Sequence, residues 1–217
     1  VPGLDLTGLR VAWSPTLGGL PIDPAVSGVL AAAPEAFAEL GAIVEEATPD
    51  LSEAEFAFRT LRANAFDVGF GAQFDERPDA FKRALAWNIE QGRQLSRVDV
   101  GRATAALSRV YRAGIRFFDS YDVLIAPVTQ VVPFAVDEEY PRVVAGQEQH
   151  SYLDWMRVAY HVTTLGAPAI SVPAGFTPDG LPVGLQIVTR PRADLFTLQV
   201  AAAFEAATGH GRRRPSL

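Results

Sequence analysis

Cysteine is absent from this 217-residue sequence, and lysine and methionine occur once each, as Lys82 and Met156. Without cysteine the chain can form no disulfide, no thiolate metal site and no thiol nucleophile. Cysteine usage therefore does not indicate an oxidising or a reducing compartment, and a cytoplasmic location is the default expectation. Lys82 lies beside Arg83 on a predicted helix, where a lysine is normally solvated surface rather than a buried, neutral base.

Long apolar runs are also missing. No stretch approaches the roughly 20 apolar residues that cross a bilayer, and the N-terminus lacks the charged-then-apolar pattern of a signal peptide. We therefore expect no membrane association. The first residue is Val1 rather than a start methionine, which we interpret as the mark of a chain processed at its N-terminus or excised from a longer protein.

Positive charge is in the minority, with 19 Lys and Arg against 25 Asp and Glu and a net charge of −6. Nucleic-acid-binding proteins usually present a basic face, and the only basic run here is residues 212–214. We interpret that run as a solvated tail. The composition is otherwise that of an ordinary globular protein, and nucleic acid is not an expected partner.

Motifs for cofactors and metals are missing too: there is no phosphate loop, no GxGxxG and no histidine pair at metal-ligand spacing. We therefore expect neither a cofactor nor a metal. A Ser-His-Asp triad could be assembled on paper from Ser171, His161 and Asp122, but no serine lies in a GxSxG elbow. His161 is interpreted as a partly buried histidine with its hydrogen bonds satisfied. We assign no catalytic residue to this chain.

The beginning of the chain predicts a parallel βαβ unit. A short apolar run at 9–13 suits a buried strand. Asp23 and the proline after it then open a helix over 24–40, which ends at Gly41. A second strand is predicted at 42–45.

Helices dominate the middle of the chain. Ser52 and Glu55 have the spacing of a capping box that opens a helix running to about residue 66. Residues 79–118 predict two helices that separate near 96–99, with Asp99 capping the second. The remaining predicted elements are a strand at 122–126 closed by Pro127, a loop at 134–150, a helix at 151–162, strands at 169–172 and 183–188, and a helix at 193–207.

A tight turn is predicted between the last two strands. Pro178 fixes φ near the value that the second position of a turn needs, and Asp179 can bond its own backbone. Gly180 would then supply the positive φ that closes the turn. Gly184, inside the following strand, indicates a place where another backbone or a ligand comes close.

Several segments resemble the amidase-signature family. Residues 121–129, YDVLIAPVT, are similar to the family's YDVLLTPT, and residues 165–176, LGAPAISVPAGF, resemble its TGLPAISVPCGF. The second segment continues into residues 179–186, which resemble the family's DGLPVGLQ, and into a helix like its LLRVAAAFE. The opening residues 6–12, together with 39–42, look like the family's mid-chain LKGLRIGV and LEELGAxV segments. The resemblance covers nearly the whole chain, in order.

The resemblance implies an α/β fold, a mixed sheet flanked by helices, in which residues 1–217 are the C-terminal portion of an amidase-signature domain. Family members cleave carboxylic amides to acid and amine with a serine in a GGSSGGSA-type segment, a second serine and a lysine. No such cluster occurs here, since the pair Gly18-Gly19 is followed by leucine and proline, and Lys82 does not match the family's lysine. The catalytic half would therefore lie upstream of Val1.

The resemblance also directs attention to a substrate pocket, whose wall we expect to include Thr129, Trp155 and Tyr160. Family members that hydrolyse glutamine usually carry an aspartate about ten residues before the glycine that corresponds to Gly166, and here Met156 holds that position. Loss of the acid argues against a substrate ammonium group. Trp155 indicates a more apolar amide.

Two other interpretations stay open. The chain could be a stand-alone, non-catalytic binding or assembly module of amidase ancestry, or a subunit fragment of a glutamine-dependent amidotransferase. Because a piece of a sheet leaves a strand edge and a face uncovered, we expect an apolar docking surface. The expected partners are the missing N-terminal half, a small-molecule amide in the intact enzyme, and further copies of this chain through self-association.

Overall fold

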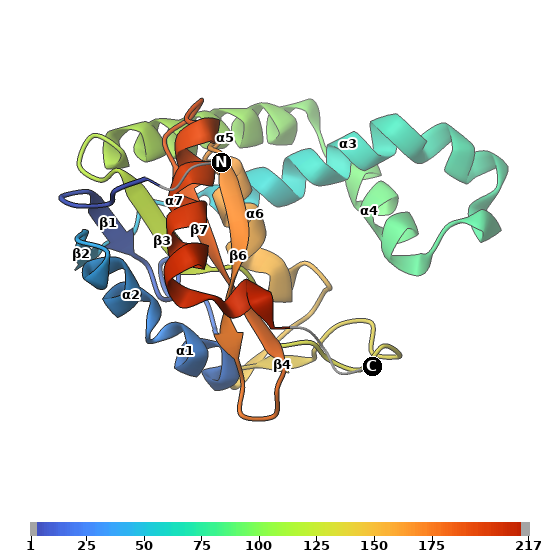
Figure 1. Ribbon diagram of the computed structural model, residues 1–217. Coiled ribbons are helices and arrows are strands. Elements are labelled where there is room, and N and C mark those ends of the chain that lie inside the picture. Colours follow the sequence, from blue (N-terminus) through green and yellow to red (C-terminus); the bar gives the residue numbers. More distant parts are fainter. Residues whose placement is uncertain (1–3, 214–217) are drawn as a thin grey trace.

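A five-stranded mixed sheet forms the centre of the protein in a computed structural model that describes residues 4–213 (Figure 1). Val1 and Arg214 lie outside the described residues. In sheet order the strands are β2 (Ile43–Glu46), β1 (Arg10–Trp13), β3 (Val123–Pro127), β7 (Pro182–Thr189) and β6 (Ala169–Phe176). β1 pairs in parallel with β2 and β3, whereas β7 is antiparallel to β3 and β6. The predicted α/β class with a mixed sheet is confirmed, and so is the parallel βαβ unit.

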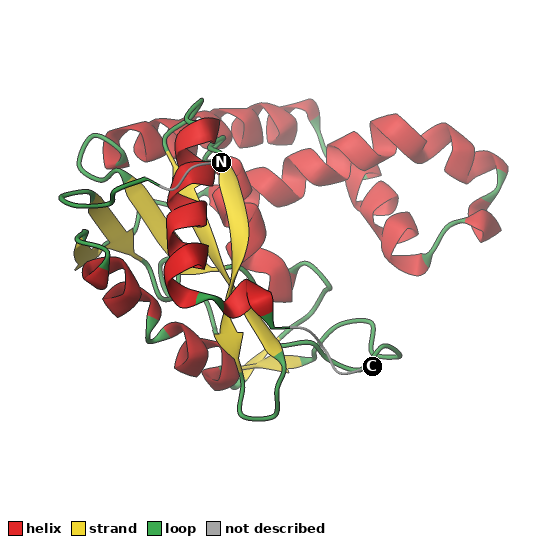
Figure 2. Ribbon diagram, viewed as in Figure 1, coloured by secondary structure: helices red, strands yellow, loops and turns green. Residues whose placement is uncertain are grey.

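Helices cover both faces of the sheet (Figures 1 and 2). Those on one face are α1 (Pro24–Leu30), α2 (Ala33–Glu39) and α7 (Asp194–Thr208). Phe37 of α2 stacks there on Phe204 of α7, with ring centroids 5.1 Å apart. On the other face lies α6 (Arg157–Thr164), where the carbonyl of Val158 accepts a hydrogen bond from Gln186 of β7. Every residue of β3 is buried because both of its faces are covered.

A helical arm extends away from the sheet (Figure 2). The helices of this region are α3 (Ala54–Glu76), the single turn η1 (Pro78–Ala80), α4 (Arg83–Arg93) and α5 (Arg97–Phe117). α4 folds back on α3, and their close approach requires glycine at position 92, because a Cβ atom there would lie 2.3 Å from the carbonyl oxygen of Ala63. α5 begins with a capping box in which Ser96 is the N-cap residue and Asp99 is the reciprocating acid, not the cap itself.

Two helix starts differ from the prediction. The helix expected over 24–40 is two helices, because Pro34 has no N–H to donate to the carbonyl of Leu30. The capping box expected at Ser52 is not formed. The Ser52 hydroxyl instead donates to Asp50 Oδ1 at 2.7 Å, and α3 begins at Ala54 without a side-chain cap.

α3 also continues to Glu76, well beyond its predicted end near residue 66. It contains Gly69 and Gly71, and glycine inside a helix costs about 1 kcal/mol relative to alanine. α4 offsets this cost, since its Arg93 forms an ion pair with Asp75 at 2.9 Å and donates to the carbonyl of Gly71 at 3.1 Å. Tertiary contacts, rather than local propensity, set the length of the helix.

The segment before α6 contains more structure than the predicted loop. Its hairpin of β4 (Val143–Val144) and β5 (Gln147–Glu148) turns at Ala145 and Gly146, which have φ angles of 47° and 78°. Strands of two residues are too short to leave an alternating pattern in a sequence. The helix predicted at 151–162 is divided into a 3-10 turn, η2 (Asp154–Met156), and α6.

The turn between β6 and β7 has the predicted geometry. Gly180 has a φ of 85° and donates its N–H to the carbonyl of Thr177 at 2.8 Å. Thr177 also accepts, through its hydroxyl oxygen, the N–H of Leu181 at 3.0 Å. A Cβ atom at Gly180 would meet only the Arg213 guanidinium, at 3.8 Å. Backbone conformation, rather than space, is therefore what requires glycine here.

Replacing Gly180 by valine should lower the free energy of unfolding by about 1–3 kcal/mol, because a β-branched residue fits a positive φ worst. Asparagine should cost clearly less. Urea melts of the purified chain measure both. Gly101→Val is the matched control, since Gly101 lies in α5 with open space and its φ is not positive. Equal stability of the valine and asparagine variants would contradict the turn assignment.

Helix α6 buries the side chains of Tyr160, which was expected in a substrate pocket, and of His161. Tyr160 is 3% exposed and stacks on Phe58 of α3, with centroids 4.2 Å apart. Burial raises the pKa of Tyr160 to about 12, although the nearby Arg59 guanidinium acts to lower it. His161 is 6% exposed, and neither ring nitrogen has a hydrogen-bond partner among the described residues. The expectation that its hydrogen bonds are satisfied is wrong.

Burial lowers the pKa of His161 from 6.5 to about 4, so the folded chain binds the proton more weakly than the unfolded chain does. Stability should therefore fall as the pH drops from 7 to 4, and His161 should account for roughly 3 kcal/mol of that fall. His161→Leu should flatten the profile of unfolding free energy against pH over this range. The control is His150→Leu, at an exposed position. An unchanged slope in His161→Leu would show that His161 does not carry the effect.

Candidate functional site

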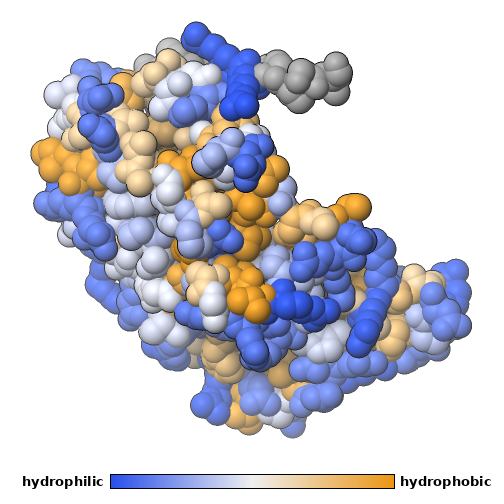
Figure 3. Space-filling view, turned by 90° about the horizontal axis from the view of Figure 1, so that it is seen from below, coloured by the Kyte–Doolittle hydropathy of each residue, from blue (hydrophilic) through white to orange (hydrophobic). Residues whose placement is uncertain are grey.

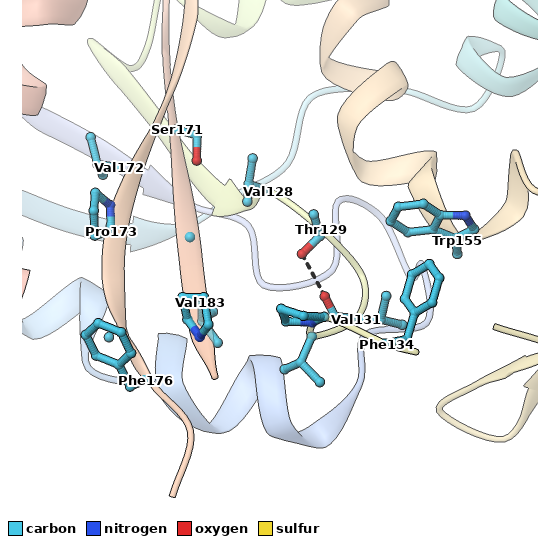
Figure 4. A pocket seen from close by; sticks show the side chains of 15 residues that line it. Val128, Thr129, Val131, Phe134, Trp155, Ser171, Val172, Pro173, Phe176 and Val183 are labelled. Atoms are coloured by element: carbon cyan, nitrogen blue, oxygen red, sulfur yellow. Dashed lines mark hydrogen bonds between the residues drawn. The ribbon is translucent and has the colours of Figure 1, made fainter. Parts of the chain in front are cut away.

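An apolar cavity of about 510 Å³ opens where β3 ends, beside the end of the sheet that carries the β6–β7 turn (Figure 4). Seen from that end of the molecule, apolar side chains gather along the middle of the surface (Figure 3). Among the described residues that line the cavity, Thr129 and Ser171 carry hydroxyl groups and Trp155 carries a ring N–H. The other lining residues are Val128, Val131, Val132, Pro133, Phe134, Val172, Pro173, Gly175, Phe176, Pro182, Val183 and Gly184.

The loop after β3 forms one wall and is held by three hydrogen bonds. Thr129 Oγ1 donates to the carbonyl of Val131 at 2.8 Å, which closes a short turn. The buried side chain of Gln130 donates to the carbonyl of Pro21 at 3.0 Å, and its backbone carbonyl accepts from Asp23 at 2.8 Å. The loop is thereby tied to the segment that enters α1.

The facing wall comes from β6 and β7. Gly184 keeps it open, because a Cβ atom there would lie 2.8 Å from Val128 Cγ1 and 3.0 Å from Ser171 Oγ. The Phe176 ring lies at this side of the cavity (Figure 4). The Arg213 guanidinium lies 4.1 Å from the centre of that ring, a distance typical of a cation–π contact. The basic run interpreted as a solvated tail thus makes at least one contact with the body of the protein.

Two aromatic rings form the opposite side, where Trp155 of η2 meets Phe134 edge to face (Figure 4). Their centroids are 5.4 Å apart, and the ring planes are inclined by 83°. Trp155 Nε1 is buried without a hydrogen-bond partner among the described residues. The cavity therefore lies between two aromatic sides, and among the described residues that line it none carries a charged side chain.

Two of the three residues predicted to line a substrate pocket, Thr129 and Trp155, line this cavity. Tyr160 is not in it, since its ring packs between α6 and α3. Whether any of the three contacts a substrate stays a prediction. Sequence reasoning missed Phe134 and Phe176, although the apolar run before Phe134, outside any predicted element, was a usable signal.

The triad drawn on paper from Ser171, His161 and Asp122 is not assembled. Ser171 lines the cavity, whereas Asp122 precedes β3 at the opposite end of that strand and accepts the N–H of Arg10 at 2.8 Å. His161 is buried in α6 without a partner. Lys82 is exposed at the start of α4. None of these residues forms a nucleophile–base pair.

Residues 4–213 contain neither a cluster of metal ligands nor a membrane-spanning helix. Within residues 4–213, no group of three or more histidine and acidic side chains is placed to hold a metal ion. Over the same range, no helix has both the length and the apolar character that crossing a membrane requires. The cavity can accept an uncharged, apolar group and offers it two hydroxyl groups.

Comparison with known sequences gives matches along nearly the whole chain. The model of the family described as Amidase matches residues 4–198. An acylamidase of Rhodococcus erythropolis is 37% identical over 218 residues, which cover 98% of this chain and 45% of that protein. A glutamyl-tRNA(Gln) amidotransferase subunit of Streptococcus equi subsp. zooepidemicus is 30% identical over 242 residues, covering 99% of this chain and 48% of the relative.

Comparison with solved structures agrees. A bacterial aryl acylamidase of the amidase signature family superimposes with a TM-score of 0.86 at 25% identity, over 99% of this chain and 48% of that one. The chain spans about half the length of the relatives that it matches. Because the family model covers most of the sequence and the fold agrees, the chain belongs to the amidase family, the amidase-signature enzymes.

Proposed function

We propose that this chain is the C-terminal portion of an enzyme that hydrolyses carboxylic amides, and that its cavity holds the apolar part of an acyl amide. The uncharged cavity between Trp155 and Phe176 carries the proposal, because it suits an alkyl or aryl group and no ion. The likeness to acylamidases supports it. Thr129 and Trp155 are the residues of the predicted set that we expect to contact the substrate.

The reacting groups would come from outside this chain. In the Ser-Ser-Lys mechanism that the resemblance implies, a serine adds to the amide carbonyl carbon, and the proton that it loses passes through the second serine and the lysine to the leaving amine. Water then hydrolyses the acyl-enzyme to the acid. The exposed Lys82 and the separated Ser171 and His161 support this division of roles, in which the present chain binds and orients the amide.

Glutamine is a poorer candidate substrate than a neutral amide. It carries an ammonium and a carboxylate, and none of the described residues that line the cavity has a charged side chain to pair with either. Met156, where glutamine-hydrolysing members carry an acid, agrees with this preference. The amidotransferase relatives therefore support the fold and the family more than the substrate.

The missing half and further copies of this chain are the proposed macromolecular partners. β6 is the last strand of the sheet, so one of its edges has no neighbouring strand among the described residues. We expect the rest of the protein to cover this edge, and isolated chains to associate through it.

The purified chain should not hydrolyse 4-nitroacetanilide above the buffer rate, because it offers no nucleophile with a base beside it. Release of 4-nitroaniline, followed by absorbance, measures this. Turnover that disappears in Ser171→Ala or His161→Ala would contradict the proposal and revive the local triad. The stand-alone binding module predicts the same inactivity, but also that no catalytic serine and lysine precede Val1 in the reading frame.

Gly184→Ala should weaken binding of acetanilide by about tenfold, because the new methyl group would meet Val128 and Ser171 at the cavity wall. Isothermal titration calorimetry of the chain measures the dissociation constant. Gly28→Ala is the matched control, since a Cβ atom at this α1 residue has no neighbour within 4 Å. Equal affinities of wild type and Gly184→Ala would place the ligand elsewhere.

A further inference from the structure

The turn that carries Trp155 is held by the side chain of the residue before it. Asp154 Oδ2 accepts the backbone N–H groups of His150 and Ser151, each at 2.7 Å. Asp154 is 7% exposed, so its carboxylate holds the entry to η2 from inside the protein. Asp154 thus acts on the backbone that sets where the indole of Trp155 lies.

The same carboxylate is tied to the helical arm. Its Oδ1 forms an ion pair with the guanidinium of Arg59 on α3, and Arg59 is held in turn by Glu55, one helical turn earlier, at 3.0 Å. Burial acts to raise the pKa of Asp154, but the backbone N–H groups and the Arg59 guanidinium lower it below its usual range. The ionised form is therefore the stable one, and the pair is present at neutral pH.

A second arginine closes the turn from the other side. Arg157 Nε donates to the carbonyl of Asp154 at 2.9 Å, and its terminal nitrogen lies 3.4 Å from Gln149 Oε1. Arg157 also lies 3.9 Å from Glu55. η2 is consequently held through both the side chain and the carbonyl of Asp154. Glu55 of α3 lies beside both of the arginines that make these contacts.

From this arrangement we propose that Asp154 is a positioning residue: its ion pair with Arg59 transmits the position of α3 to Trp155 and so sets the aromatic side of the cavity. Trp155 follows Asp154 directly and packs edge to face on Phe134, so a shift of η2 displaces the ring from its partner. That Trp155 contacts substrate rests on the proposed function. That Asp154 positions Trp155 does not.

The test uses the whole 217-residue chain labelled with 5-fluorotryptophan. Fluorine NMR then gives one signal for each of the three tryptophans, Trp13, Trp87 and Trp155. Asp154→Asn keeps an acceptor for the two backbone N–H groups but removes the charge. We expect this variant to shift the Trp155 resonance and leave that of Trp13 in place. Acetanilide should bind about tenfold more weakly to the variant.

The matched control is Glu53→Gln. Glu53 pairs with Arg109 of α5 through two contacts of 2.6 Å, so it is also an ion pair made by the start of α3, but neither residue lines the cavity. This variant should leave the Trp155 resonance and the acetanilide affinity unchanged. A Trp155 shift as large as that of Asp154→Asn would overturn the proposal, because any loss of an α3 ion pair would then suffice.

Variants of Arg59 test the same ion pair from its other partner, and they can be measured even if Asp154→Asn does not fold. Arg59→Gln should reproduce the Trp155 shift, and Arg59→Lys should restore most of the wild-type spectrum. An unmoved Trp155 signal in both Asp154→Asn and Arg59→Gln would refute the positioning role, whatever acetanilide does. If acetanilide does not bind the wild-type chain while Trp155 still shifts, the proposed function fails and the positioning role stands.

Discussion

The side chain of Gln186 joins three elements beside the segments that line the cavity: β7, the end of β3 and the start of α6. It lies buried on β7, and its Nε2 donates to the carbonyl of Pro127 at 2.8 Å and to that of Val158 at 3.3 Å. The end of β3, the start of α6 and the centre of the hairpin are thereby held together. Leaving these carbonyls unpaired in the interior would cost about 1–3 kcal/mol each. The loop that lines the cavity begins directly after Pro127, so the contact with Gln186 anchors the point at which that loop starts.

The sequence predicted correctly those element boundaries that neighbouring residues determine. Pro127 closes β3, and Gly180 takes its positive φ because residues on either side form the turn. The helix expected over 24–40 failed for a local reason, since Pro34 divides it. Two other failures were decided by contacts outside the predicted motif. α3 reaches Glu76 because Arg93 of another helix holds its glycine-containing end. The Ser52 hydroxyl donates to Asp50, an acceptor outside the Ser52–Glu55 motif, and does not cap α3.

The candidate site was predictable to the same extent. Thr129 follows a strand end that the resemblance located correctly, and it lies in the cavity wall. Tyr160 was expected beside Trp155 on one continuous helix, but α6 begins only at Arg157, after a 3-10 turn. An α-helix advances about 100° per residue, so side chains five residues apart point to different faces even without that turn. Tyr160 accordingly faces Phe58 of α3, while Trp155 faces the cavity. Helical periodicity was therefore enough to separate the two residues, and the expectation that both line one cavity overlooked it.

Charge is distributed unevenly across η2, and this distribution bears on selectivity. On the inner side Asp154 meets Arg59, whereas on the cavity side Trp155 presents a surface without charge. An ion buried in the cavity would lose part of its water shell, at a cost of several kcal/mol, and would meet no charged side chain among the described residues that line it. An uncharged group loses much less, and its apolar surface gains about 25 cal/mol for each Å² buried. The arrangement that holds Trp155 therefore fits the neutral acyl amide of the proposed function better than a charged one.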